Sequence, residues 1–163
     1  VSPAGFSYVM MTSAITVVIF QFAISRRAKA YPPMLMLALG AALYMVGFSL
    51  YGIVTAYWMF LAAMIVITFG EMLVVPISQA VAAHFAPEDM RGRYMAVFGL
   101  SWAIPGAIGP VAAGMVMDRF NPYLVWYIGG VLCLVSASSF LVLQWLKGKQ
   151  FAVLQTQEAP AAD

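Results

Sequence analysis

Charged residues are scarce in this sequence. Aspartate, glutamate, lysine and arginine together make up 9% of its 163 residues, whereas soluble globular domains contain roughly 25% charged residues. Because 64% of the residues are hydrophobic, the composition excludes a soluble domain and indicates a membrane protein. A single cysteine excludes a disulfide framework and a cysteine-based metal site. The basic residues form no block interleaved with aromatic residues, so we predict no nucleic-acid partner.

Motifs of soluble enzymes are also missing. The sequence contains no glycine-rich phosphate loop, no HExxH motif, no GxSxG motif and only one histidine. An intramembrane hydrolase would need a nucleophile paired with a base, or a second acid, within the bilayer. Only one acidic residue lies deep in an apolar run. We therefore predict that the protein is not an enzyme and that it binds neither a metal nor a cofactor.

Long apolar runs, by contrast, are abundant. A helix needs about 20 apolar residues to cross a bilayer, and proline suits the start of a helix better than its interior. These rules predict an all-α, polytopic membrane protein with five transmembrane helices in residues 1–147. The predicted spans are 5–24, 33–53, 57–85, 94–117 and 124–146. Residues 148–163 are polar and rich in alanine, which predicts a cytoplasmic disordered tail.

Five crossings place the two ends of the chain on opposite sides of the membrane. Seven of the eight basic residues then fall on one side, and only Arg119 falls on the other. Because basic residues gather on the cytoplasmic side, we predict an extracytoplasmic N-terminus and a cytoplasmic C-terminus for this chain. The chain starts at Val1 with no basic segment before its first apolar run, which does not resemble a signal peptide. We interpret the sequence as a fragment of a longer protein.

Glu71 lies near the centre of the third span. An ionised carboxylate at that depth costs at least about 2.5 kcal/mol, so it should face water or protein, or be protonated. We predict that Glu71 carries a proton or binds a cationic substrate. Ser78 and Gln79 follow on the same side of the helix and indicate the wall of a cavity. A purely structural hydrogen bond between helices is the alternative role for Glu71.

Prolines and glycines interrupt the third and fourth spans. Pro76 removes one backbone hydrogen bond five residues after Glu71 and frees a carbonyl near Met72. In the fourth span, small residues permit close helix packing and prolines permit bending, which predicts a deformable helix that acts as a conformational hinge or lies at a moving interface. A static kink at Pro76, and tight packing without motion in the fourth span, are the alternatives. The fourth-span residues are Pro105, Gly106, Gly109, Pro110 and Gly114.

The turn between the third and fourth spans places acids beside bases. Its charged residues are Glu88, Asp89, Arg91 and Arg93. An exposed ion pair contributes only about 0 to 1 kcal/mol, which is enough to bias a conformational equilibrium of similar size. We therefore predict a cytoplasmic loop latch. The alternative is that these arginines only set the topology.

Three segments of the chain resemble a known family. The segments GEMLVVP (70–76), FAPEDMRGRYM (85–95) and GPVAAG (109–114) resemble the major facilitator superfamily, and in particular its bacterial twelve-helix drug:proton antiporters. GPVAAG is similar to the glycine-rich antiporter motif, with alanine at 113 in place of one glycine. The resemblance implies that the five spans are helices eight to twelve, most of the C-terminal six-helix half. It also implies that the third span lines the central cavity.

The resemblance carries a functional expectation. It implies a secondary active transporter with alternating access in the bacterial inner membrane, exporting small or lipophilic compounds in exchange for protons, as in multidrug resistance. Its partners would be a small-molecule substrate, protons, the lipid bilayer and the missing N-terminal half of the same protein. A metabolite importer or facilitator of the same superfamily, and a non-transporting helical subunit of a membrane complex, remain as alternatives.

Overall fold

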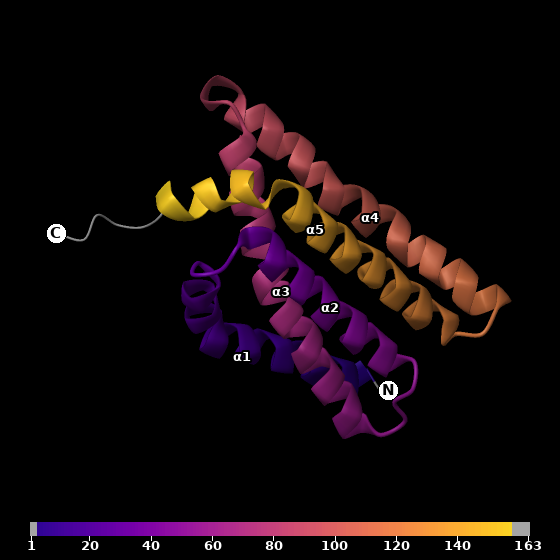
Figure 1. Ribbon diagram of the computed structural model, residues 1–163. Helices are drawn as coiled ribbons and strands as arrows, with labels where there is room; N and C mark the ends of the chain where they lie inside the picture. Colours follow the sequence, from indigo (N-terminus) through magenta and orange to yellow (C-terminus); the bar gives the residue numbers. More distant parts are fainter. Residues whose placement is uncertain (1–2, 158–163) are drawn as a thin grey trace.

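The structure is a computed structural model that describes the backbone of residues 3–157 and the side chains of residues 7–147. This part of the chain is all-helical, as predicted (Figure 1). The elements are α1 (Pro3–Ala28), α2 (Pro33–Tyr51), α3 (Tyr57–Phe85), a short 3-10 helix η1 (Glu88–Met90), α4 (Arg91–Arg119) and α5 (Leu124–Gln157). Five of these helices are long and apolar enough to cross a membrane.

The helix ends follow the chemistry of the sequence. α2 begins at Pro33, where the missing amide hydrogen costs nothing, and α3 has the predicted bounds. α1 and α4 run past their predicted spans because the arginines that flank the apolar runs are good helix formers and continue the helix.

The C-terminal segment differs from the prediction. We expected disorder from residue 148, but α5 continues to Gln157 across a non-helical residue, Lys147, with φ of −130° and ψ of 18°. Figure 1 shows that the segment after this kink turns away from the rest of α5. Because residues 148–157 contain strong helix formers such as lysine, glutamine, alanine and leucine, a helix is favoured there over a disordered chain. The remainder of the predicted tail lies outside the described residues.

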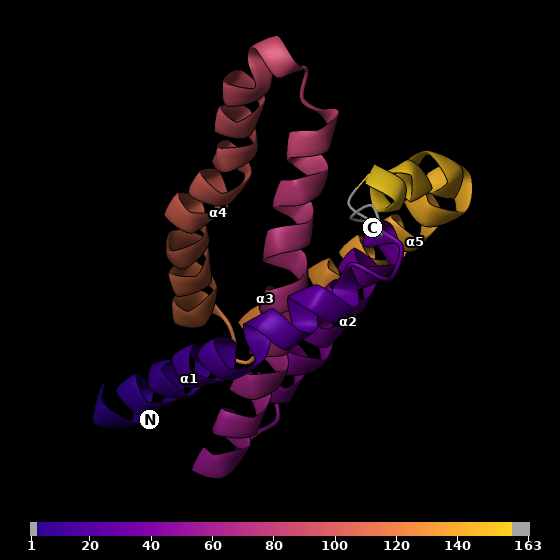
Figure 2. The ribbon, with the colours of Figure 1, turned by 90° about the vertical axis from the view of Figure 1, so that its left-hand side faces the viewer.

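α2 and α3 form the centre of the bundle. α2 packs against both α3 and α5, and α1 packs against α3. At the shared core, Met34 and Leu37 of α2 contact Val74 and Ile77 of α3. α4 touches this bundle only lightly, and none of its residues is buried. Figure 2 shows α4 set apart from α1, α2 and α3 over most of its length.

Glycines bring α2 and α3 unusually close together. A Cβ atom added at Gly70 would lie 2.8 Å from the Gly40 carbonyl oxygen, and one added at Gly47 would collide with the Ile67 side chain. Between helices in lipid there is no hydrophobic drive to associate, so such backbone proximity supplies the van der Waals contact that holds them. The α2–α3 pair is therefore the rigid platform for the rest of the fold.

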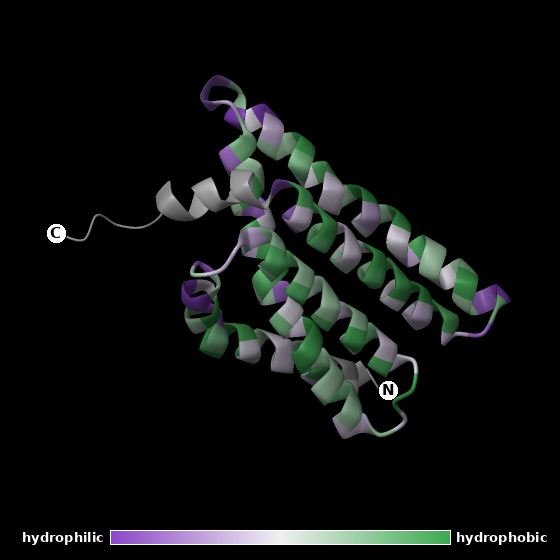
Figure 3. Ribbon diagram, viewed as in Figure 1, coloured by the Kyte–Doolittle hydropathy of each residue, from purple (hydrophilic) through white to green (hydrophobic). Residues whose placement is uncertain are grey.

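The two ends of the bundle differ in chemistry. The α1–α2 and α3–α4 connections and the α5 kink lie toward one end, and the α2–α3 and α4–α5 connections lie at the other (Figure 1). Hydrophilic residues gather in the α3–α4 and α4–α5 connections and at the end of α1, whereas the α2–α3 connection and the helices are mainly hydrophobic (Figure 3). At the second end the ring of Tyr51 lies 4.9 Å from that of Trp126 and 5.6 Å from that of Phe60. Aromatic rings of this kind anchor a protein at a membrane interface.

The glycine contact leads to a stability prediction. We expect Gly70→Ala to lower the stability of the protein in detergent by about 1–3 kcal/mol, because the new methyl group would meet the Gly40 backbone, which cannot rotate away. Gly129→Ala is the matched control, since its Cβ would lie 3.7 Å from the Phe48 ring, an ordinary contact. The gain in helix propensity is shared by both variants. Equal thermal unfolding temperatures for the two would contradict the proposed close contact.

Candidate functional site

Glu71 lies at membrane depth on α3. The 19 residues of α2 extend for about 27 Å at 1.5 Å per residue, close to the thickness of the hydrocarbon layer of about 30 Å. At one end of α2 the Tyr51 hydroxyl donates to the Phe60 carbonyl at 3.4 Å, and at the other Met34 packs against Val81. Glu71 falls between these two levels. Its position in the sequence and its level beside α2 both place the Glu71 carboxylate inside the apolar layer of the membrane.

The Glu71 side chain is exposed on the isolated chain. Within the described part of the chain, no hydrogen bond or ion pair engages its carboxylate. Val75, Ser78 and Ala82 follow on the same face of α3 and are half-buried, and Gln79 beside them is exposed. The Ser78 hydroxyl donates to the Val75 carbonyl at 3.0 Å. The structure therefore places an available carboxylate and an available amide along this face, whereas the serine hydrogen is used within the helix.

Tyr44 is a polar neighbour of Glu71 that the sequence analysis missed. It belongs to α2 and lies close enough to Glu71 for the two groups to interact electrostatically. Its ring stacks on Phe48 with a centroid distance of 5.9 Å. A tyrosine in the middle of an apolar run is a usable signal, because a phenol hydroxyl in hydrocarbon needs a polar partner. The pairing itself depends on the α2–α3 contact.

A polar seam joins α1 to α3 near Glu71. Thr68, fully buried and one turn before Glu71, hydrogen-bonds to Ser13 Oγ at 2.9 Å and to the Met64 carbonyl at 2.8 Å. Thr16 is also buried and donates to the Thr12 carbonyl at 2.7 Å. These contacts satisfy the hydroxyl groups, as burial in an apolar environment requires. α1 is thus held by polar bonds against the part of α3 that presents Glu71.

The backbone at Pro76 is satisfied from outside its own helix. Pro76 has no amide hydrogen, so the carbonyl of Met72 loses its usual donor within α3. The Gln21 side chain of α1 reaches this carbonyl, with Nε2 at 3.5 Å from the oxygen, and also donates to Ser25 Oγ at 2.9 Å. The carbonyl that Pro76 leaves without a donor is therefore that of Met72, as predicted. Its partner Gln21 was not predicted, because the contact spans 51 positions in sequence.

α4 is one continuous helix that contains two prolines. It runs from Arg91 to Arg119 across the stretch from Pro105 to Gly114 for which we predicted bending. A helix keeps its remaining hydrogen bonds on either side of a proline and can bend instead of ending there, and Figure 2 shows α4 changing direction partway along its length. A Cβ atom added at Gly106, Gly109 or Gly114 would meet no atom within 4 Å. Within the described residues, this glycine-rich face has no partner helix.

The α3–α4 connection is held by a bond to the backbone. Arg91 donates from Nε and Nη2 to the Ala83 carbonyl, each at 3.3 Å. Carbonyls in the last turn of a helix lack partners within it, so this contact caps α3. Glu88, Asp89 and Arg93 are exposed, and no ion pair joins them to Arg91 within the described chain. Arg91 therefore has a structural role at the helix end in this conformation.

The contact between Gln21 and the Met72 carbonyl can be tested with a double-mutant cycle. We expect Gln21→Leu to destabilise the protein in detergent by about 0.6 kcal/mol, a typical value for one hydrogen bond between membrane helices. In a Pro76→Ala background the restored amide hydrogen of residue 76 can occupy the Met72 carbonyl, so Gln21→Leu should cost almost nothing. A cost that is the same in both backgrounds would exclude the proposed pairing.

Comparison with known proteins places the chain in a family. A model of the Major Facilitator Superfamily matches residues 1–160. The Na(+), Li(+), K(+)/H(+) antiporter of Planococcus maritimus is 28% identical over 111 residues, covering 68% of this chain and 26% of that protein. The MFS-type transporter YhjO of Bacillus subtilis is 35% identical over 83 residues, covering 51% of this chain and 20% of YhjO. YttB of the same organism is 28% identical over 144 residues, covering 87% and 36%.

The chain therefore spans about a third or less of the length of these relatives. No solved structure matches it significantly. The relatives are transporters and not enzymes, in agreement with the absence of enzyme motifs from the sequence. With five membrane-spanning helices and a family model that covers nearly its whole length, the chain belongs to the Major Facilitator Superfamily.

Proposed function

We propose that the intact protein is a secondary active transporter that works by alternating access and exports small or lipophilic compounds in exchange for protons. The observation that carries this proposal is Glu71, a carboxylate at membrane depth that no described residue engages. A charge left in that position is costly unless it meets water or an opposite charge. An aqueous pathway shared with helices from the rest of the protein would supply the water or the opposite charge.

Protonation makes Glu71 suitable for coupling. A carboxylate that meets water from each side of the membrane in turn can take up a proton on one side and release it on the other. Alternating access would then move one proton per cycle through the same residue. Tyr44 lies close enough to this carboxylate to interact with it electrostatically, and Gln79 on the same side of α3 adds an amide that can contact a polar substrate.

Exchange of a monovalent cation for protons is a second candidate function. The relative from Planococcus maritimus is named as an antiporter of Na(+), Li(+) and K(+) against H(+). A single unpaired carboxylate can bind either a proton or a small cation, so the same residue would couple both movements by competition. Transport assays with a lipophilic cation such as ethidium and with Na⁺ distinguish the two functions.

The open face of α4 supports a two-half architecture. Its glycines have no neighbouring atoms within the described chain, and the relatives contain far more sequence than this chain covers. We place the missing upstream helices against this face, where Pro105 and Pro110 allow the helix to bend as the halves move. The loop residues Glu88, Asp89, Arg91 and Arg93 would then bias the equilibrium between the two states.

The same proposal includes an orientation. α1 ends at Arg26 and Arg27, and α4 begins at Arg91, so these basic residues belong to the end of the bundle that also holds the α5 kink (Figure 1). By the positive-inside rule, this end faces the cytoplasm of a bacterial cell, with the N-terminus of the chain on the outer side.

Glu71→Gln in the full-length protein tests the coupling role. We expect substrate export driven by a proton gradient to fall at least about tenfold, because the amide cannot exchange a proton in this pH range. Glu71→Asp should retain part of the activity. Asp118→Asn, which removes an exposed acid near the end of α4, is the matched control. Unchanged transport and unchanged pH dependence in Glu71→Gln vesicles would remove Glu71 from the mechanism.

Gly109→Leu tests the role of α4. We expect this variant to insert normally but to lose most transport, because the larger side chain would hold the upstream helices away from α4. Ala107→Leu places similar bulk on the opposite side of the helix, two positions earlier, and should transport normally. Surface expression of both variants, measured by labelling, checks insertion. Normal turnover by Gly109→Leu would contradict a close interface at this face.

A further inference from the structure

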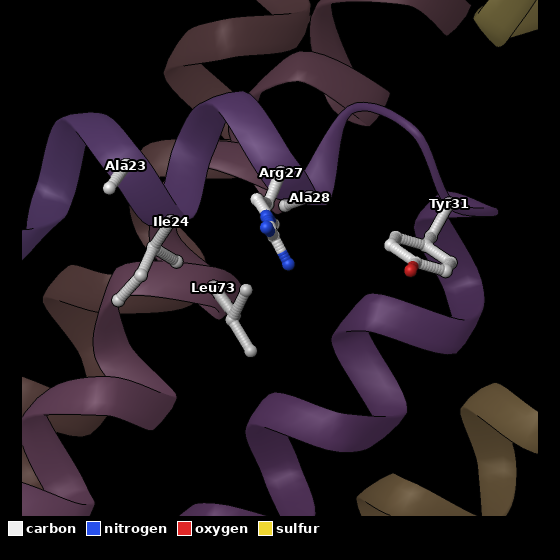
Figure 4. A pocket seen from close by; sticks show the side chains of 6 residues that line it. All are labelled: Ala23, Ile24, Arg27, Ala28, Tyr31 and Leu73. Atoms are coloured by element: carbon white, nitrogen blue, oxygen red, sulfur yellow. The ribbon is translucent and has the colours of Figure 1, made fainter.

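A cavity opens at the end of α1, away from the face that carries Glu71. One part, of about 270 Å³, lies between α1, the α1–α2 connection and α3 (Figure 4), and is lined by Ala23, Ile24, Arg27, Ala28, Tyr31 and Leu73. A second part, of about 610 Å³, is lined by Phe22, Ala23, Arg26, Arg27, Ala30 and Tyr31. The two parts share Ala23, Arg27 and Tyr31. The two parts are therefore adjacent, and together they have two arginines along their walls.

The cavity has a polar side and an apolar side. In Figure 4 the Arg27 side chain extends into the space between Leu73 and Tyr31, and Ala23 and Ile24 lie on the far side of Leu73 from Tyr31. In the described part of the chain, no acid or carbonyl occupies the guanidinium groups of Arg26 and Arg27. A guanidinium presents a planar set of donors that fits the oxygens of a phosphate in a bidentate manner. The apolar side suits hydrocarbon.

These features together select the ligand. A free phosphate ion would bind the arginines but would make no contact with the apolar wall. A phospholipid satisfies both sides, because its phosphate is joined to acyl chains. The cavity also lies at the end of the bundle where basic residues gather, and basic pockets between membrane helices on the cytoplasmic side bind anionic lipid headgroups. We infer that this cavity binds an anionic phospholipid, with the phosphate at Arg26 and Arg27 and the first acyl carbons against Ala23, Ile24 and Leu73.

Bound lipid would act on the packing of α1 against α3. Leu73 forms a buried cluster with Ala28 at the end of α1 and Met36 of α2, and it lies next to Met72, whose carbonyl accepts from Gln21. A lipid that fills the space beside Leu73 would hold these elements together. This inference concerns a lipid site and does not depend on proton coupling at Glu71.

Lipid retention by the full-length protein tests the inference. The probe is a nanodisc with phosphatidylglycerol and phosphatidylcholine in equal amounts, and the readout is the number of lipids of each kind that remain bound in native mass spectrometry. We expect Arg26→Gln/Arg27→Gln to weaken phosphatidylglycerol retention by roughly fivefold per arginine, equivalent to about 1 kcal/mol each. Arg91→Gln/Arg93→Gln removes the same charge from the other connection at this end and should retain the lipid. An equal loss in both double variants would overturn the inference, because it would reflect general surface charge only.

A second variant avoids any effect of arginine loss on insertion. Ala23→Phe fills the wall shared by both parts of the cavity and leaves every charge in place. We expect it to lower phosphatidylglycerol retention about as strongly as the loss of one arginine. Unchanged retention would overturn the site. Added inorganic phosphate should not displace the lipid, and displacement at millimolar phosphate would assign the arginines to a free anion instead.

Discussion

Polar groups inside a bilayer have no water to bond, and this constraint governs the whole structure. The helices satisfy their own backbones, and the hydroxyls of Thr16 and Thr68 bond to nearby carbonyls. Even the carbonyl left without a donor by Pro76 has a partner, the Gln21 amide. Glu71 departs from this pattern, because its carboxylate has no partner in the described chain. The most costly group in the membrane is therefore one that makes no hydrogen bond or ion pair with the described residues.

Glycine contacts lead to the same conclusion for α4. In α2 and α3, added Cβ atoms at Gly40 and Gly70 would meet neighbouring atoms at 2.6 Å and 2.8 Å, so these glycines are used in packing. At Gly106 and Gly109 of α4 the same construction meets nothing within 4 Å. Glycine in a helix interior costs about 1 kcal/mol relative to alanine, a cost that close packing offsets in lipid. The two α4 glycines carry this cost without a described partner, which is consistent with helices supplied by the rest of the protein.

The sequence was a good guide to features that depend on composition along the chain. It predicted the five helices, the bounds of α3 and the orphan carbonyl near Met72, because hydrocarbon thickness and the chemistry of proline act locally. It missed Gln21, Tyr44 and Thr68 as neighbours of the site. Helices that are hydrophobic on all sides give no periodicity from which facing residues can be read. We predicted disorder from residue 148, but the structure has helix as far as Gln157, because the helix-forming residues there keep the helix intact.

α1 connects several of these features along one helix. Its Ser13 bonds to Thr68, its Gln21 bonds to the Met72 carbonyl, and Arg27 lines the cavity beside Leu73. Each hydrogen bond between membrane helices contributes only about 0.6 kcal/mol, whereas separating α2 from α3 would open a contact formed directly between backbones. The α1–α3 seam is thus the weaker of the two interfaces. A shift of α1 along α3 would change the support of the Met72 carbonyl and the shape of the cavity together, while α2 continued to hold α3 in place.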